Sequence, residues 1–329
     1  MRASISRRGA VLAVCMAALV IGPVDPSRAQ TFPSKPLRFI VPFPAGGATD
    51  AAARAMQPQL EKILGQTVVI ENRAGAGAVI GLDAIAKAAP DGYTFGIGPA
   101  GAMSVNPAMQ VKMPFDVRKD LAAISNLAAT PFILGAASTF KANSLRDVIE
   151  QAKAAPGTLS IGHGGNGTSM YFTALLFITM AEVQIGLVPY RGTALVANDL
   201  IGGHVGLGIV DPPPAQAAIR DGRIKALAVS SKQRFAFFPD IPTFDEQGLK
   251  GYETTGWFGL VAPAATPPEI IAKLNAASVA ALKDPEVAQR IRTIGMEPIP
   301  STAAEFSAFI GSEIDKISKV LAKAGGAPQ

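Results

Sequence analysis

The clearest structural signal in this chain is the stretch Pro42-Phe43-Pro44-Ala45-Gly46-Gly47-Ala48-Thr49-Asp50, which joins a short apolar segment to an alanine-rich helical one. Adjacent glycines allow a tight turn and leave backbone N–H groups uncovered, because they carry no Cβ. The helix that follows adds N–H groups without intrahelical partners and the positive end of its dipole. We therefore expect this turn to hold an anion without any basic side chain.

A second turn of the same kind follows much later, at Gly162-His163-Gly164-Gly165-Asn166-Gly167-Thr168-Ser169. It again stands between a strand-like segment, 158–161, and an apolar helical one that begins near Met170. Two such turns, far apart in one chain, predict a ligand that is held from two sides.

The first 29 residues have the composition of an export leader. Arg7-Arg8 lies in a basic start, residues 9–22 are apolar, and Ser27-Arg28-Ala29 offers small residues for cleavage before Gln30. The apolar run is too short to span a membrane comfortably. We therefore expect a signal peptide over 1–29 and a periplasmic location, with the general and the twin-arginine export routes both open.

Charge and cysteine content exclude several classes of function. The leader holds four arginines and one aspartate, a formal charge of +3, so only +2 of the total of +5 belongs to the exported part. No Lys/Arg cluster suggests nucleic acid as a partner. The single cysteine, Cys15, lies in the leader, so we expect no disulfide, no thiolate nucleophile and no cysteine metal ligand.

The order of apolar segments predicts an α/β protein. Strand-like and helical segments alternate as far as about residue 229, a pattern typical of mostly parallel sheets. The expected strands are 37–41, 67–71, 94–97, 133–136, 160–161, 186–189, 206–210 and 226–230. The expected helices are 50–64, 79–88, 144–154, 170–181, 193–202, 213–221, 268–283, 285–294 and 302–322.

The C-terminal part of the chain is rich in helices and has too few strands to form a domain alone. We expect it to pack back onto the N-terminal part. This gives one lobe made of 30–130 and 232–329, and a second made of 131–231, with the ligand cleft between them. Two chain crossings would then serve as hinges.

Several motifs favour other functions, but each lacks its partner. Gly162-x-Gly164-x-x-Gly167 matches a dinucleotide fingerprint, but no acidic residue ends the next strand, where a ribose hydroxyl would be held. No paired nucleophile and base is apparent, so we expect no enzyme, no cofactor and no metal. His163 lies within the second glycine turn and is either a ligand contact or a structural turn residue.

Two acidic residues stand at expected helix starts. Asp50 is interpreted as a helix cap or first-turn acid, an assignment compatible with an indirect ligand role through water. Asp211 precedes Pro212-Pro213-Pro214 and either caps a helix or faces the cleft.

These segments together resemble a known family, the substrate-binding subunits of tripartite tricarboxylate transporters, also called the Bug family of periplasmic receptors. Each segment alone is weak, but their number and order are specific. They are Pro42-Phe43-Pro44-Ala45-Gly46-Gly47 through Asp50, Glu71-Asn72-Arg73-Ala74-Gly75-Ala76-Gly77, Pro90-Asp91-Gly92-Tyr93-Thr94, Gly165-Asn166-Gly167-Thr168-Ser169, Val188-Pro189-Tyr190-Arg191-Gly192, Asp199-Leu200-Ile201-Gly202-Gly203, 221–229, Pro239-Asp240-Ile241-Pro242-Thr243 and 257–263.

The resemblance implies a type II periplasmic-binding-protein fold whose two lobes close on a small organic carboxylate. It also implies two integral-membrane transporter subunits as partners and a receptor that acts as a monomer. The implied ligand-binding residues in the first turn are Phe43, Ala45, Gly46, Gly47, Thr49 and Asp50. Those of the second are Gly164, Gly167, Thr168 and Ser169, with His163 in the same turn and Asp211 nearby.

This chain departs from the family pattern at Pro99-Ala100-Gly101-Ala102-Met103-Ser104, where relatives often carry hydroxyl-bearing side chains and histidine. The loss of hydroxyls predicts a ligand with one well-held carboxylate and a more apolar or aromatic remainder. A ligand-sensing partner of a membrane sensor kinase, using the same pocket, is the alternative to a transport receptor.

Overall fold

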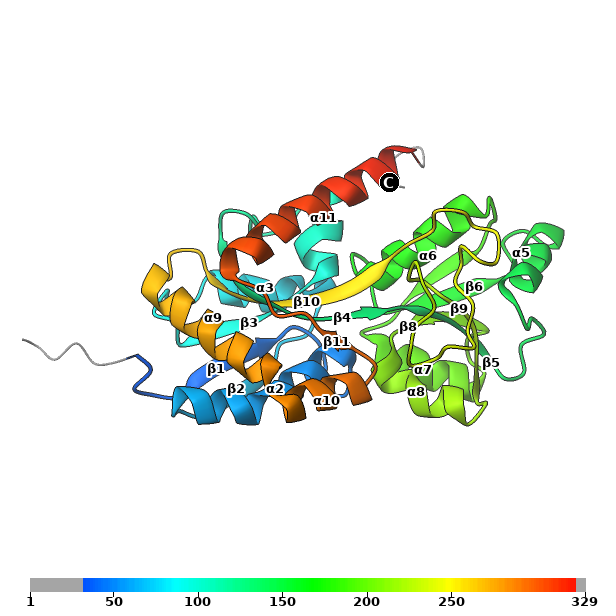
Figure 1. Ribbon diagram of the computed structural model, residues 1–329. Coiled ribbons are helices and arrows are strands. Elements are labelled where there is room, and N and C mark those ends of the chain that lie inside the picture. The colour runs from blue at the N-terminus through cyan, green and yellow to red at the C-terminus, as the bar shows by residue number, and fades with distance from the viewer. Residues whose placement is uncertain (1–31, 324–329) are drawn as a thin grey trace, which may run out of the picture. The chain divides into compact units, whose positions relative to one another are not determined.

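Two mixed sheets organise residues 32–323, which the computed structural model describes (Figure 1). The expected leader, 1–29, lies outside the described residues. Residues from Lys35 onward form one compact unit that contains both sheets.

The first sheet has the strand order β11-β4-β10-β3-β1-β2. Its strands are β1 (Leu37–Val41), β2 (Val68–Asn72), β3 (Thr94–Pro99), β4 (Leu121–Pro131), β10 (Thr255–Pro263) and β11 (Glu297–Pro298). β1 pairs in parallel with β2 and β3, whereas β10 is antiparallel to both of its neighbours. Figure 1 shows β4 and β10 running side by side from this sheet toward the second one.

The second sheet has the order β7-β6-β8-β5-β9. Its strands are β5 (Ile133–Ala137), β6 (Ser160–His163), β7 (Gly186–Pro189), β8 (Leu207–Val210) and β9 (Ile224–Val229). β6 is parallel to β7 and β8, and β5 is antiparallel to β8 and β9.

The expectation of mostly parallel sheets is therefore wrong, although the α/β class is confirmed. β4 and β10 were not expected, and they bring antiparallel pairing to the centre of the first sheet. The sequence of β4, Leu-Ala-Ala-Ile-Ser-Asn-Leu-Ala-Ala-Thr-Pro, is rich in alanine, which has low strand propensity. Pairing with a long neighbour overrides that preference.

The helices lie close to their expected bounds. They are α2 (Ala48–Leu64), α3 (Val79–Ala86), α5 (Leu145–Ala154), α6 (Ser169–Met180), α7 (Thr193–Gly202), α8 (Pro212–Arg220), α9 (Pro268–Lys283), α10 (Pro285–Thr293) and α11 (Ala303–Lys323), with a short α4 (Asn106–Ala108) and a π-helical turn at Gly101–Val105. Ser144 and Asp147 form a capping box at α5, and the Asp284 side chain caps α10. Within 32–323, no helix has the length and apolar character needed to cross a membrane.

The chain passes between the two sheets beside Phe132 and again between β9 and β10. Ser230 ties these passages together, because its hydroxyl accepts a hydrogen bond from the Phe132 N–H at 2.8 Å and donates one to the Thr254 carbonyl at 2.7 Å. Ser230 is fully buried. The two passages are therefore joined side by side where the sheets meet.

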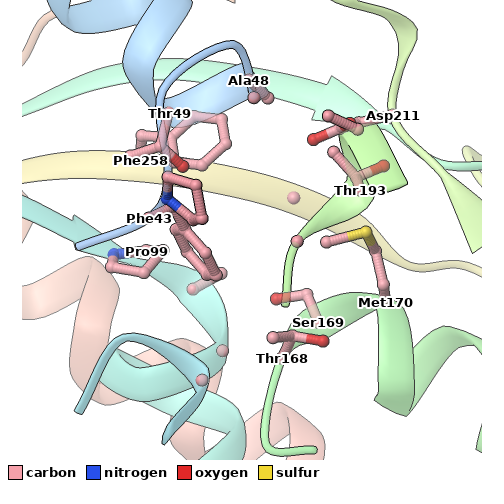
Figure 2. Close-up of a pocket in the computed structure, with 18 of the residues that line it drawn as sticks. Phe43, Ala48, Thr49, Pro99, Thr168, Ser169, Met170, Thr193, Asp211 and Phe258 are labelled. Carbon is pink, nitrogen blue, oxygen red and sulfur yellow. The ribbon is translucent and has the colours of Figure 1, made fainter. Parts of the chain in front are cut away.

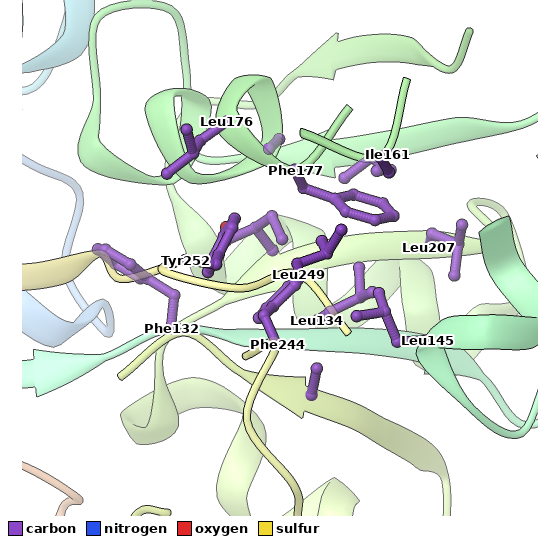
Figure 3. Close-up of a cluster of buried hydrophobic side chains, with 14 of the residues drawn as sticks. Phe132, Leu134, Leu145, Ile161, Leu176, Phe177, Leu207, Phe244, Leu249 and Tyr252 are labelled. Atoms are coloured by element: carbon purple, nitrogen blue, oxygen red, sulfur yellow. The ribbon is translucent and has the colours of Figure 1, made fainter. Parts of the chain in front are cut away.

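The second sheet is packed around an apolar cluster that takes residues from a distant part of the chain (Figure 3). Phe244 stacks on Tyr252 with ring centroids 4.2 Å apart and contacts Phe177 edge-on at 5.6 Å. The Tyr252 hydroxyl donates to the Thr173 carbonyl at 2.7 Å. Residues 244–252 therefore pack with the second sheet.

Candidate ligand-binding site

Four helices begin around one cavity of about 160 Å³. Gly47 precedes α2, Thr168 precedes α6, Gly192 precedes α7 and Asp211 precedes α8. The first N–H groups of a helix have no intrahelical acceptor, and the helix dipole is positive there. α8 begins with three prolines and offers no such N–H groups, but the starts of α2, α6 and α7 around one space make it suitable for an anionic group.

Residues of the first sheet, of the two glycine turns and of the starts of α2, α6 and α7 line the cavity (Figure 2). The lining residues are Phe43, Pro44, Ala45, Gly47, Ala48, Thr49, Gly77, Pro99, Ala100, Gly101, Phe132, Thr168, Ser169, Met170, Arg191, Gly192, Thr193, Ala194, Leu195, Asp211, Gly256, Trp257 and Phe258.

The first turn contributes four of its six predicted ligand-binding residues to the cavity lining: Phe43, Ala45, Gly47 and Thr49. Gly46 has φ +86° and lies outside the lining, where it allows the turn. Gly47, the residue before α2, makes no side-chain cap, so the first N–H groups of α2 stay uncovered.

Asp50 does not line the cavity, and its carboxylate is held by donors from the turn, from α2 and from β2. It accepts hydrogen bonds from the Gly46 N–H at 3.1 Å, from Arg54 at 2.8 Å and from the Asn72 side chain at 3.0 Å. Burial alone would raise the pKa of Asp50, but these hydrogen bonds outweigh it and lower the pKa. These hydrogen bonds agree with the interpretation of Asp50 as an acid in the first turn of its helix.

The second turn contributes Thr168 and Ser169 to the lining. The Thr168 hydroxyl accepts from the Tyr171 N–H at 3.2 Å and so caps α6. Gly164 and Gly167 do not line the cavity. A side chain at Gly164 would collide with Met170, and one at Gly167 would collide with Asn106, so both glycines allow close packing.

His163 is the last residue of β6, is fully buried and does not line the cavity. Its Nδ1 accepts a hydrogen bond from the Gly165 N–H at 3.3 Å, and its ring lies 5.2 Å from that of Tyr171. Burial lowers the pKa of His163, so the neutral ring is favoured. Of the two roles left open for it, this placement favours the structural one.

Two glycines let the two sides of the cavity approach closely. A Cβ at Gly101 would lie 2.7 Å from the Gly167 carbonyl oxygen and from the Thr168 Cα, and one at Gly77 would collide with the Asn166 carbonyl. Real Cβ atoms are essentially never found so close to backbone. Any side chain at Gly101 therefore opposes this contact between the second turn and the π-helical turn.

Asp211 lines the cavity and is 2% exposed. Its Oδ1 has no hydrogen-bond partner among the described residues, and neither has the buried Oγ1 of Thr193. Burial raises the pKa of Asp211 to about 7, and the nearby Thr193 hydroxyl, although outside hydrogen-bond geometry, opposes this to a smaller extent. Of the two roles considered for Asp211, the structure favours the one that faces the cleft.

Large apolar side chains that were not predicted complete the site. Phe258, Met170 and Trp257 line it together with the predicted Phe43. Trp257 is 2% exposed and packs edge-on against Phe306 at 5.7 Å. Trp257 and Phe258 lie on β10, and Met170 lies in the first turn of α6. Because β10 was not expected as a strand, its side chains could not be placed. Thr193 also lines the site and was not predicted to do so. Its position at the start of the expected helix 193–202 is the sequence feature that could have indicated it.

The sequence profile described as "Tripartite tricarboxylate transporter family receptor" matches residues 52–325, which is most of the chain. The chain belongs to this family. The protein BugT of Bordetella pertussis is 36% identical to it over 305 residues, covering 92% of this chain and 94% of BugT. The resemblance noted in the sequence is thereby confirmed.

Solved structures place the receptor among periplasmic binding proteins. Rpa4515 of R. palustris, solved with adipate, is 34% identical with a TM-score of 0.86 and covers 91% of this receptor and 100% of its own chain. The periplasmic binding protein BugD is 31% identical with a TM-score of 0.85, covering 91% and 100%. MatC from Rhodopseudomonas palustris, with bound malate, is 32% identical with a TM-score of 0.83, covering 88% and 99%. The family and these neighbours are solute-binding proteins, so the receptor is not an enzyme and has their two-lobed fold.

Proposed function

We propose that this receptor is exported to the periplasm, binds a small organic carboxylate between two lobes and delivers it to a tripartite tricarboxylate-type membrane transporter. The observation that carries the proposal is the pair of helix starts, α2 and α6, that meet one cavity from its two sides. Hydrogen bonds to a charged group contribute roughly 1.5–3 kcal/mol each, so a few backbone N–H groups support micromolar binding once apolar contacts are added. Two neighbours solved with adipate and with malate support the same ligand class.

The lobes in this proposal are 30–130 with 232–329, and 131–231. The packing of Phe244 and Tyr252 with the second sheet supports assigning 244–252 to the second lobe as well. The carboxylate is held by the two turns, and the remainder of the ligand lies among Phe43, Met170 and Phe258. The proposed ligand therefore has an apolar or aromatic body.

The first test is a thermal-shift screen of residues 30–329 with succinate, malate, adipate, citrate, benzoate, terephthalate and nicotinate. A ligand that binds only the native state raises its stability in proportion to the logarithm of concentration over the dissociation constant. We expect a clear rise in Tm with adipate or an aromatic acid, and a smaller rise with succinate or malate. No shift with any of these acids, from folded and ligand-free protein, contradicts the proposal.

The variant Gly101→Ala tests whether ligand binding needs the close contact between the second turn and the π-helical turn. Gly101→Ala places a Cβ 2.7 Å from the Gly167 carbonyl oxygen, so we expect at least tenfold weaker binding of the best acid in the screen. Gly311→Ala, where a Cβ meets nothing within 4 Å, is the matched control and keeps its affinity. Unchanged affinity in both variants contradicts closure around the ligand.

A further inference from the structure

Asp211 stands before a helix that offers its carboxylate no hydrogen bonds. An acid before the first helical residue normally accepts from the N–H of the second or third residue. In α8 the first three residues are Pro212-Pro213-Pro214, and proline has no backbone N–H. The side chain of Asp211 accordingly makes no cap hydrogen bond.

The carboxylate is nevertheless buried at the cavity wall. Asp211 is 2% exposed and Thr193 is 4% exposed, and Figure 2 shows the two next to each other at one end of the site. Asp211 Oδ1 and Thr193 Oγ1 are both without partners among the described residues. A threonine hydroxyl has one proton to donate, whereas an ionised carboxylate accepts at about four positions. These two side chains therefore present more acceptors than donors.

A buried charged group with an unfilled acceptor position is costly, and the cost falls when a donor reaches it. Among the residues that line the cavity, Arg191 is the cationic one, and it is exposed to solvent. Above pH 7, where Asp211 is ionised, a second carboxylate on the ligand would meet it as a like charge. An N–H group would meet a free acceptor and form a charge-assisted hydrogen bond.

We propose that the ligand carries an N–H donor, an ammonium or an amide, that hydrogen-bonds to Asp211 while its carboxylate is held by the glycine turns. This inference rests on the proposed function, since it needs the carboxylate end to bind as described there. A cavity of 150 Å³ with apolar walls accepts a benzene ring, so the space of about 160 Å³ suits a ring or short chain between the two polar ends.

The test compares acids that share a skeleton and differ at one end. Isothermal titration of ligand-free protein, residues 30–329, at pH 8, where Asp211 is ionised, uses terephthalate, 4-carbamoylbenzoate and 4-(aminomethyl)benzoate, and then adipate and 6-aminohexanoate. We expect at least one N–H-bearing acid to bind at least tenfold more tightly than the dicarboxylate of the same skeleton. Asp211→Asn should weaken that acid at least tenfold and strengthen the dicarboxylate, because the like charge is gone. Asp240→Asn, at an exposed loop position, is the matched control and should change neither.

The outcomes separate the inference from the function. If both dicarboxylates bind more tightly than their N–H analogues to the native protein, the inference is wrong while the carboxylate receptor stands. If none of the five acids binds to folded protein, both are wrong. The comparison within the native protein decides the matter even if Asp211→Asn does not fold.

Discussion

Asp50 and Asp211 occupy similar places in the chain but have opposite surroundings. Each follows a strand and stands at the start of a helix, and each is nearly fully buried, at 3% and 2% exposed. Asp50 accepts three hydrogen bonds, including one from Arg54 one helical turn later. Asp211 faces three prolines and has an unpartnered oxygen in the cavity wall.

The difference shows what a buried acid can do at a helix start. Asp50 is satisfied by Gly46, Arg54 and Asn72 and holds the loop in shape, so its neighbours Ala48 and Thr49, and not Asp50 itself, line the cavity. Asp211 has its hydrogen-bonding capacity left over for a ligand. A satisfied acid therefore positions the site, and an unsatisfied one is available to bind in it.

The largest expected effect is that two matched substitutions change the free energy of unfolding in opposite directions at pH 8. Asp50→Asn places an amide where three donors converge, and we expect the free energy of unfolding to fall by about 3 kcal/mol. Asp211→Asn removes a buried charge that has one oxygen without a partner among the described residues, and we expect an increase of about 1 kcal/mol or more in the ligand-free protein. Urea denaturation measures both.

Arg54→Gln is the control for the first of these substitutions. The Arg54 side chain is 53% exposed, so its ion pair with Asp50 is screened by solvent and contributes about 1 kcal/mol or less. A loss in Arg54→Gln as large as that in Asp50→Asn would assign the effect to the ion pair. Equal losses in Asp50→Asn and Asp211→Asn would remove the contrast between the two acids.

Local pattern predicted most of the fold, but not the pairing of distant segments. The helix starts were predictable from Ser144, Asp284 and the glycine turns, because caps and turns depend on neighbours in sequence. β10 was missed as a strand because its long antiparallel pairing with β4 is not visible in its own residues. The same limit applies to Asp50, whose partner Asn72 lies 22 positions away. Asp211 was left with two roles, although the three prolines that favour one of them are adjacent in the sequence.

The dependence of stability on pH provides a second, intermediate test. The folded-state pKa of Asp211 is about 7, above its ordinary value of 3.8, so the folded protein holds a proton that the unfolded chain releases. The contribution of Asp211 to the free energy of unfolding is therefore complete below pH 3.8, and it is lost as pH rises toward 7. Between pH 5 and 7 the loss amounts to about 2 kcal/mol.

His163 changes stability in the opposite direction over part of this range. Burial lowers its pKa below 6.5, so its contribution is lost as pH falls through and below that value. Asp50 contributes above pH 3.8 and adds no slope between pH 5 and 7. Subtracting the unfolding free energies of Asp211→Asn from those of the native protein at each pH isolates Asp211. If this difference in unfolding free energy does not change between pH 5 and 7, the Asp211 carboxylate is ionised and satisfied throughout that range.

The smallest expected effect comes from restoring the missing donor. Pro214→Ala supplies an N–H at the third position of α8, which the Asp211 side chain can accept. The gain of about 1 kcal/mol is partly offset, because losing a proline costs about 0.4–1 kcal/mol through the unfolded state.

The matched control for that cost is Pro285→Ala, at the start of α10. There Asp284 already accepts from the N–H groups of Glu286 and Val287, so a new N–H adds nothing to the cap. At pH 8 we expect Pro214→Ala to be about 1 kcal/mol more stable than Pro285→Ala by urea denaturation, and its loss of stability between pH 5 and 7 to be smaller than in the native protein. If that loss is unchanged, the carboxylate was not short of donors. If it shrinks, the helix and the ligand compete for the same oxygen, and the three prolines are what leave that oxygen free for the ligand.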